Sequence, residues 1–297
     1  MVVDSLRVQT VAVVSPGAMG SAMADALARG RLRVIATVSG RSERTTRLAD
    51  RAGIELLPDL ASVVREADAV LSVVPPEAAE AVVADISEAA RNQNVLPLIA
   101  DLNAIAPATA RRAEAIAAEA NCHFVDGSIS GPPPWNPGTT RLYLSGPRAS
   151  ELAALPFDGV ETIVVGDVGA ASAVKMSTAS VYKGSTALLT QALLAAEWHG
   201  VLEHVLADLR LGTPELVSQV ERRLANAATK SDRYIAEMHE IAASQSAAQL
   251  TPALFEAMAE VFEALSQTSL AKRHPEDLGR DLELRAVLEG LRRPLSD

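Results

Sequence analysis

The sequence predicts a doubly wound parallel α/β domain followed by an all-α domain. Short apolar runs alternate with helical patterns through the first half of the 297 residues. After about residue 166 the strand patterns stop, and long alanine- and leucine-rich helical patterns fill the rest. The change falls on a Gly-Asp-Val-Gly segment at 166–169. We therefore expect a first domain over residues 1–166 and a helical second domain over residues 167–297.

Seven apolar runs are expected to form the strands, because each is short and bounded by turn or helix signals. The runs span residues 8–14, 33–38, 68–74, 95–101, 121–126, 141–145 and 160–165. Helical patterns lie between the earlier runs, over 18–30, 42–53, 77–91 and 107–120. This alternation is typical of a parallel sheet covered by helices on both faces, in which ligands bind at the carboxyl ends of the strands.

The turn after the first run reads Ser15-Pro16-Gly17-Ala18-Met19-Gly20. A glycine turn between a strand and a helix directs backbone N–H groups and the positive end of the helix dipole at one place, where Rossmann-type domains bind a dinucleotide pyrophosphate. The usual pattern is G-x-G-x-x-G, and Ser15 replaces its first glycine. Gly17 would let the backbone approach the phosphates, and Gly20 would let the helix pack on its strand. All six residues are predicted cofactor ligands; a structural turn without a ligand is the alternative.

The end of the second run indicates which dinucleotide binds. An NAD-binding domain usually has an acidic residue there, which accepts a hydrogen bond from the ribose 2′-hydroxyl. This chain has no carboxylate at that position. Arg41 and Arg44 can instead bind a 2′-phosphate, and the hydroxyls of Ser39 and Ser42 can assist. We therefore predict NADP(H) as the cofactor; the alternative is a solvated helix N-terminus. Val74 and Pro75, at the end of the third run, are predicted to line the same cofactor site.

Lys175 lies near the start of a helix that is predicted over about residues 168–200. At 100° per residue, Tyr182 lies about 20° from Lys175 on the helix surface, so the two share one face. A lysine can donate a proton to a developing alkoxide, or accept one from an alcohol, once burial adjusts its pKa. The alternative is an ordinary surface lysine. Lys175 is thus a candidate acid–base residue.

These segments together resemble the β-hydroxyacid dehydrogenases, the group that contains 6-phosphogluconate and 3-hydroxyisobutyrate dehydrogenases. Residues 15–20 resemble the cofactor loop of that family. Residues 126–131 resemble its substrate loop, and residues 138–142 the glycine turn that follows. The glycine pair at 166–169, followed by Lys175, resembles the glycine pair and catalytic lysine at the family spacing. In whole-chain character the sequence is similar to a 6-phosphogluconate dehydrogenase-like branch with its own C-terminal domain.

The resemblance implies roles for several residues. Lys175 would be the acid in reduction and the base in oxidation, with Tyr182 as a second proton donor. Ser130 and Gly131 would hold an anionic group of the substrate. Asn103, after the fourth run, would bridge cofactor and substrate; an Asx turn is the alternative.

The chain also departs from the family pattern. Ala179 stands where the family has an asparagine that contacts the substrate, and Tyr182 stands where 6-phosphogluconate dehydrogenases have a glutamate. The substrate loop continues through three prolines, beginning with Pro132, to Trp135. Prolines carry no backbone donor and fix a rigid turn, and Trp135 would offer an apolar wall. Pro132 and Trp135 are therefore predicted to contact the substrate, and we do not expect that substrate to be 6-phosphogluconate.

We therefore expect an NADP(H)-dependent oxidoreductase that acts on CH–OH groups, moving a hydride between nicotinamide and a small hydroxy acid or oxo acid. One alternative is an imine or ketone reductase of specialised metabolism, which Tyr182 leaves open. Another is a non-catalytic NADP-binding sensor or scaffold, against which the presence of Lys175 argues.

Composition and charge limit the partners. The net charge of −10 argues against a nucleic-acid surface. No apolar run is long enough to cross a bilayer, and the single cysteine, Cys122, suggests a reducing compartment, so we expect a cytoplasmic protein without membrane contact. Its histidines do not share a face, and we expect no metal site. The helix over 168–200 is apolar on several sides, which predicts a homodimer.

Overall fold

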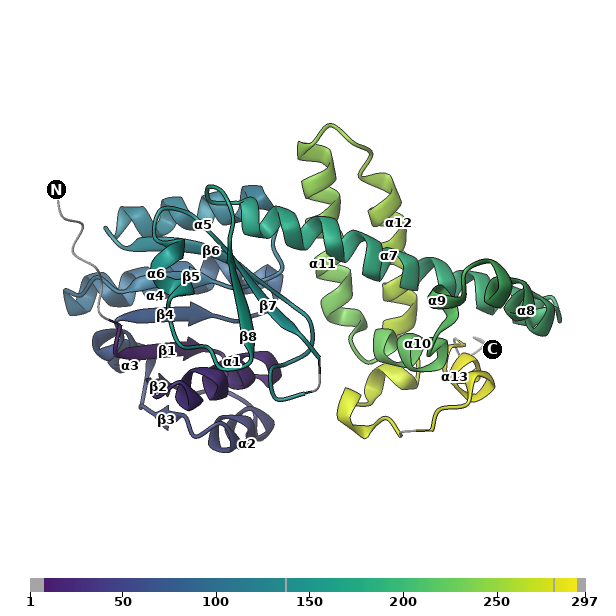
Figure 1. Cartoon of the computed structure of the whole chain (residues 1–297), viewed down its shortest axis with the longest axis horizontal. Coiled ribbons are helices and arrows are strands. Elements are labelled where there is room, and N and C mark those ends of the chain that lie inside the picture. The colour runs from purple at the N-terminus through teal and green to yellow at the C-terminus, as the bar shows by residue number, and fades with distance from the viewer. Residues whose placement is uncertain (1–7, 137, 280, 293–297) are drawn as a thin grey trace. The chain divides into compact units, whose positions relative to one another are not determined.

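The computed structural model describes residues 8–136, 138–279 and 281–292. The chain forms two compact units, Met1–Met176 and Ser177–Asp297 (Figure 1). The division falls inside the long helix α7 (Ala170–Trp198), and not at the glycine pair before it where we expected the boundary. The reason is that the first turns of α7 are hydrogen-bonded to the sheet of the first unit, as shown below.

The first unit is built on an eight-stranded sheet with the order β3-β2-β1-β4-β5-β6-β7-β8. Its strands are β1 (Thr10–Val14), β2 (Arg33–Ala36), β3 (Glu55–Leu56), β4 (Ala69–Ser72), β5 (Leu98–Asp101), β6 (His123–Ser130), β7 (Thr140–Ser145) and β8 (Val160–Val164). Each of the seven predicted runs overlaps a strand, although β6 extends beyond its predicted end at residue 126. The sequence did not indicate β3, which is two exposed residues long.

Helices cover both faces of this sheet (Figure 1). They are α1 (Ala18–Arg29), α2 (Glu43–Arg51), α3 (Leu60–Glu66), η1 (Pro76–Ala78), α4 (Ala79–Gln93), α5 (Pro107–Glu119) and α6 (Ala149–Ala153). Side chains alternate along β1, so Val11 and Val13 pack in one core with residues of α1, α2 and α6. Ala12 and Val14 pack in a second core with α3, α4 and α5. The predicted doubly wound architecture is confirmed.

One strand pair differs from the prediction of a parallel sheet. β7 runs antiparallel to β6, with Asp126 opposite Ser145 and Ser130 opposite Arg141. Only residues 131–139 separate these strands, and a parallel crossover needs a dozen or more residues. The other strand pairs are parallel. The length of the connection therefore sets the direction of β7.

The second unit consists of helices. Beyond the C-terminal part of α7 they are α8 (Leu202–Gly212), α9 (Pro214–Val217), α10 (Val220–Ala228), α11 (Ser231–Ala247), α12 (Ala253–Ser266), η2 (Leu270–Lys272), η3 (Pro275–Asp277) and α13 (Leu284–Leu291). Helices α11 and α12 form a hairpin, in which Tyr234 and Phe262 meet edge to face with ring centres 5.2 Å apart. Glu237 of α11, almost fully buried, pairs with Lys183 of α7 and with Arg233. None of the described helices has both the length and the apolar character that crossing a membrane requires.

Candidate active site

The turn between β1 and α1 contains the residues that we predicted to hold a pyrophosphate. Ser15 has a φ of 65°, the left-handed conformation that glycine usually supplies at this place. The Gly17 amide donates a 2.7 Å hydrogen bond to the Ser15 carbonyl and closes the turn. A Cβ on Gly20 would lie 2.7 Å from the Ser15 carbonyl oxygen and 3.2 Å from Val13 Cγ1. Glycine at position 20 therefore lets α1 pack closely on β1.

The N-terminus of α1 is accessible beside this turn. Gly17 precedes the helix, and no side chain of the described residues caps it. A Cβ on Gly17 would meet no atom within 4 Å. Buried Ser21 braces the turn, because its Oγ donates to the Pro16 carbonyl at 2.7 Å. Ala18 and Met19 begin the helix, where N–H groups have no partner inside the helix and attract anions. These residues fit a dinucleotide pyrophosphate.

The turn after β2 contains the residues that we predicted to bind a 2′-phosphate. Its backbone is closed by the Arg41 amide, which donates to the Val38 carbonyl at 3.0 Å. The Oγ of Ser42 caps α2 and accepts a first-turn amide at 3.3 Å. Ser39 and Arg41 are exposed, and Arg44 is half-buried in the first turn of α2. The four predicted residues thus lie together at one helix N-terminus.

Asn103 joins the end of β4 to the end of β5. Its Oδ1 accepts the Val74 amide at 2.7 Å, and its Nδ2 donates to Ser72 Oγ at 3.1 Å and to Asp101 Oδ2 at 2.7 Å. Only 3% of Asn103 is exposed. Its side chain therefore braces the loop that contains Val74 and Pro75, whereas we expected it to reach cofactor and substrate. The Asx turn forms at Asp101, whose Oδ1 accepts the Asn103 amide at 3.0 Å.

Asp101 is a fully buried carboxyl group at the end of β5. Burial raises its pKa from 3.8 to about 7, although hydrogen bonds from Asn103 and Ser72 act in the opposite direction. The neighbouring carboxyl group of Asp126 raises the Asp101 pKa further. Asp101 thus holds a proton at mildly acidic pH, close beneath the loop that it helps to position.

Asp126, in the middle of β6, holds the start of α7. Its Oδ2 accepts hydrogen bonds from Ser145 Oγ at 2.7 Å, the Gly169 amide at 2.9 Å and the Ser172 amide at 3.1 Å. Its Oδ1 accepts from Ser172 Oγ at 2.6 Å. Gly169 has a φ of 100°, which favours glycine at this turn. The sequence marks Asp126 only as the first residue of a substrate loop, because its partners lie on distant elements.

Lys175 reaches the end of the same strand. It lies in the second turn of α7, half-buried, and its Nζ donates a 2.6 Å hydrogen bond to the Ile129 carbonyl. Ile129 directly precedes Ser130 and Gly131, the pair that we predicted to hold an anion. A Cβ on Gly131 would lie 2.2 Å from the Thr139 carbonyl oxygen, so glycine is required there. The structure therefore brings Lys175 and the Ser130-Gly131 pair together within the first unit.

The proline-rich segment after Gly131 is fixed at both ends. Thr140 Oγ1 donates to the Pro132 carbonyl at 2.6 Å, and the Asn136 amide donates to the Pro133 carbonyl at 2.8 Å. The Trp135 ring lies over the guanidinium of Arg51, at the end of α2, with 4.6 Å between the ring centre and Cζ. We predicted an apolar substrate wall at Trp135; one side of its ring makes this cation–π contact. No local sequence pattern indicates this pairing.

Two further positions lie along α7 in the second unit. Ala179 is buried, whereas Tyr182 is 66% exposed.

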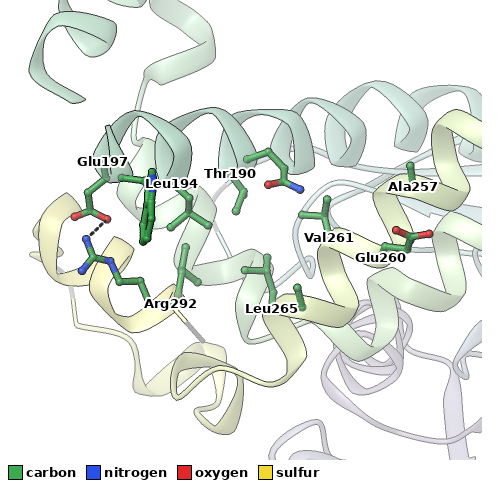
Figure 2. A pocket seen from close by; sticks show the side chains of 12 residues that line it. Thr190, Leu194, Glu197, Ala257, Glu260, Val261, Leu265 and Arg292 are labelled. Atoms are coloured by element: carbon green, nitrogen blue, oxygen red, sulfur yellow. Dashed lines mark ion pairs between the residues drawn. The ribbon is translucent and has the colours of Figure 1, made fainter. Parts of the chain in front are cut away.

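A cavity of about 680 Å³ in the second unit is lined by α7, α12 and α13 (Figure 2). Leu194, Val261 and Leu265 line it, and Glu197 pairs with Arg292 at 3.1 Å on its wall. None of the residues predicted to bind cofactor or substrate lines this cavity.

The strand–glycine turn–helix geometry and the strand order are those of a dinucleotide-binding domain. Residues 10–150 match the family model described as the NAD binding domain of 6-phosphogluconate dehydrogenase. Residues 196–265 match a second model, described as a domain of unknown function, DUF1932. The chain thus combines an NAD-binding domain of the 6-phosphogluconate dehydrogenase type with a C-terminal DUF1932 domain.

Two individual relatives are similar to most of this chain. An uncharacterized 28.5 kDa protein from Methanothermus fervidus is 28% identical over 182 residues, which are 61% of this chain and 68% of that protein. A conserved protein of unknown function, MTH1747, whose structure is described as similar to 3-hydroxyacid dehydrogenases, is 27% identical with a TM-score of 0.64. That match covers 86% of this chain and 96% of the other.

Two characterised classes of enzyme share the fold at lower identity. The 3-hydroxyisobutyrate dehydrogenase of Mycobacterium tuberculosis, solved with L-serine, is 20% identical with a TM-score of 0.69, over 96% of this chain and 99% of that chain. An imine reductase from Myxococcus stipitatus, solved with NADP+, is 20% identical with a TM-score of 0.55, over 89% and 96% of the two chains. The fold is therefore that of hydroxyacid dehydrogenases and imine reductases.

Proposed function

We propose that this protein is an NADP(H)-dependent oxidoreductase that interconverts a small hydroxy acid and the corresponding oxo acid. One observation carries the proposal: the Lys175 ammonium lies 2.6 Å from the carbonyl of Ile129, the residue that directly precedes Ser130 and Gly131. A proton donor and a candidate anion site therefore adjoin at the end of β6. Ligands of open α/β sheets bind at this edge, outside the carboxyl ends of the strands.

The residues of the chain would divide the work as follows. The amides at the start of α1 would hold the pyrophosphate of the cofactor, which supplies or accepts the hydride when bound. The Ser130 hydroxyl and Gly131 amide would hold the substrate carboxylate. Lys175 would donate a proton to the developing alkoxide during reduction and remove it during oxidation. Pro132 and the two prolines that follow it have no N–H donors, so this loop suits one carboxylate better than a phosphorylated sugar acid.

The side chains near the second strand support NADP(H) over NAD(H). Glu43, the acidic residue closest to this turn in the sequence, pairs with Arg47 along α2 at 3.7 Å. Arg41 stays exposed at the turn, where its planar guanidinium can bind a 2′-phosphate in bidentate fashion. The imine reductase from Myxococcus stipitatus, which has a similar fold, has been solved in complex with NADP+, and a variant of it in complex with NAD+. The choice of cofactor therefore rests on Arg41 and its neighbours.

The test is a turnover assay with NADPH and a panel of 2-oxo and 3-oxo acids and cyclic imines. We expect the oxo acids to be reduced and Lys175→Met to lower kcat by about 10²–10⁴, the usual scale of general acid–base catalysis. Affinity for NADPH should barely change, because Lys175 is not among the predicted cofactor ligands. Full kcat in Lys175→Met on the best substrate would show that another group transfers the proton.

Imine reduction is the second candidate, and Tyr182 is the observation that favours it. Its phenol is 66% exposed on α7, and imine reductases share the fold. In that case cyclic imines would be the best substrates, and Tyr182→Phe would lower kcat at least as much as Lys175→Met. The third candidate, a non-catalytic NADP-binding sensor or scaffold, requires that NADPH binds and that no member of the panel is turned over.

We also propose that a second copy of the chain covers the exposed side of α7 in the second unit. Val181, Leu188 and Trp198 are 66%, 63% and 83% exposed, and residues 184–196 contain no charged side chain. A stable interface buries roughly 800 Å² on each partner, and one aromatic side chain supplies about 150–250 Å² of it. Three large apolar side chains exposed along one helix, one of them within the uncharged stretch 184–196, match a homodimer interface.

A further inference from the structure

Four buried polar side chains form a row across the sheet, level with the carboxyl ends of β4 and β5. They occupy register positions on neighbouring strands: Ser72 opposite Asp101, Asp101 opposite Asp126, and Asp126 opposite Ser145. All four are fully buried. Asp101, one of the two inner members of the row, braces Asn103 and the loop after β4. Asp126, the other inner member, holds the start of α7.

The surroundings of Asp126 suit a negative charge. Four donors point at its two oxygens, from Ser145, Gly169 and Ser172. Two of these donors are amides at the N-terminus of α7, where the helix dipole favours an anion. A buried carboxylate is costly unless hydrogen bonds and charge compensate for lost hydration, and here both do. Asp126 is thus the N-terminal cap of a 29-residue helix, supplied by the sheet and not by the helix itself.

Further hydrogen bonds join β6 to α7 between Asp126 and the lysine. Asp126 binds Gly169 and Ser172, Ser128 Oγ donates to the Ala171 carbonyl at 2.8 Å, and Lys175 donates to the Ile129 carbonyl. Ser172 and Lys175 are three residues apart, so they lie on one side of the helix in successive turns. The first turns of α7 therefore lie along β6, and a change at Asp126 would be transmitted to Lys175 within about one turn.

We propose that Asp126 is the positioning residue for Lys175. It fixes the rotation and height of the first two turns of α7, so that the ammonium group lies at the Ile129 carbonyl beside Ser130. Asp126 itself is fully buried, and its two oxygens accept hydrogen bonds from Ser145, Gly169 and Ser172. This inference rests on the proposed function for the role of the proton, but the placement of Lys175 can be measured without turnover.

The test compares three variants. Asp126→Asn keeps the shape but replaces one acceptor oxygen by an NH₂ group that faces N–H and O–H donors. Ser172→Ala removes one of the four hydrogen bonds and retains the carboxylate, so it reports the same role if Asp126→Asn does not fold. Ser87→Ala is the matched control, because Ser87 is a buried hydroxyl of α4 without a hydrogen-bond partner in the described structure.

Five quantities are measured on each variant: kcat, its pH profile, the Kd for NADPH, Lys175 acetylation and hydrogen exchange. We expect Asp126→Asn to lower kcat by about 10²-fold, the scale of a 1 Å misplacement of a catalytic group, and Ser172→Ala to lower it several-fold. The pH at which kcat falls by half should shift, while the Kd for NADPH should stay within twofold. The pH dependence of Lys175 acetylation, read by peptide mass spectrometry, and hydrogen exchange of residues 170–176 should change in the same order. Ser87→Ala should match the parent in all of them.

The outcomes separate the two proposals. Faster hydrogen exchange in residues 170–176 with unchanged acetylation and an unchanged pH profile would show that Asp126 is only a structural cap, and would overturn the inference. Altered Lys175 acetylation in both Asp126→Asn and Ser172→Ala supports it, even in the absence of a substrate. An undiminished kcat in Lys175→Met contradicts the proposed function and leaves the acetylation result to decide the positioning role.

Discussion

Replacing Asp101 by asparagine should remove a pH-dependent loss of stability. The Asp101 pKa is about 7 in the folded chain, raised from 3.8 by burial. Between these values the folded protein keeps a proton that the unfolded chain releases, so stability falls as pH rises. A difference of about three pKa units corresponds to about 4 kcal/mol, complete near pH 7 and absent below about pH 4. Asparagine does not titrate and therefore lacks this loss.

The variant also carries a pH-independent effect. Asn103 donates to both oxygens of Asp101, and an amide at position 101 can accept only one of these hydrogen bonds. The lost bond costs about 1–3 kcal/mol at every pH. The expected signature is therefore a slope and not an offset: the free energy of unfolding of the variant minus that of the parent should rise by about 4 kcal/mol from pH 4 to pH 7.

Urea unfolding from pH 4.5 to pH 8, followed by circular dichroism, measures most of this slope. Asp59→Asn is the control, because the exposed Asp59 caps α3 and its pKa is lowered by hydrogen bonds from Ser62. A lowered pKa changes stability only as pH falls below the ordinary value for aspartate, so this control should give a constant difference over the same range. A constant difference for Asp101→Asn as well would refute the assignment of a buried, protonated Asp101.

Three other substitutions test the remaining proposals. Arg41→Ala should remove most of a preference for NADPH over NADH that we expect to be at least tenfold, about 1.4 kcal/mol, and equal affinities in the parent by fluorescence titration would contradict NADP(H) specificity. Gly20→Ala places a Cβ 2.7 Å from a backbone oxygen, so NADPH binding should weaken at least tenfold and the free energy of unfolding should fall by about 1–3 kcal/mol. The control is Gly212→Ala, whose Cβ would meet no atom within 4 Å, and it should change neither NADPH binding nor stability. Leu188→Asp should yield a monomer of about 31 kDa by sedimentation, whereas the control Leu211→Asp should stay dimeric. A parent protein that is monomeric at micromolar concentration would exclude the proposed dimer.

Much of the first unit could be predicted because its signals are local. The apolar run before Ser15 and the helix after Gly20 sufficed to place the cofactor turn, and the structure forms that turn between β1 and α1. The direction of β7 was also readable, from the short connection at 131–139, although the expectation of a uniformly parallel sheet overlooked it. The short β3 has no apolar pattern, and only its pairing with β2 defines it.

The contacts that organise the candidate site could not be predicted, because their partners are distant in the chain. Asp126 caps a helix through Gly169 and Ser172, more than 40 positions further on. A sequence shows capping only when the cap directly precedes its helix. The engagement of Asn103 likewise depends on the register of β4 against β5, which brings Ser72 beside Asp101.

The pairing of Trp135 with Arg51 distinguishes the fluorescence environment of this tryptophan from that of the other tryptophan of the chain, which lies in the second unit. The sequence contains two tryptophans, Trp135 in the first unit and Trp198, which is 83% exposed, in the second. A guanidinium over one indole and water around the other place the two chromophores in different environments. Single-tryptophan variants would therefore let fluorescence follow ligand binding in the first unit and self-association in the second as separate signals, without an added dye.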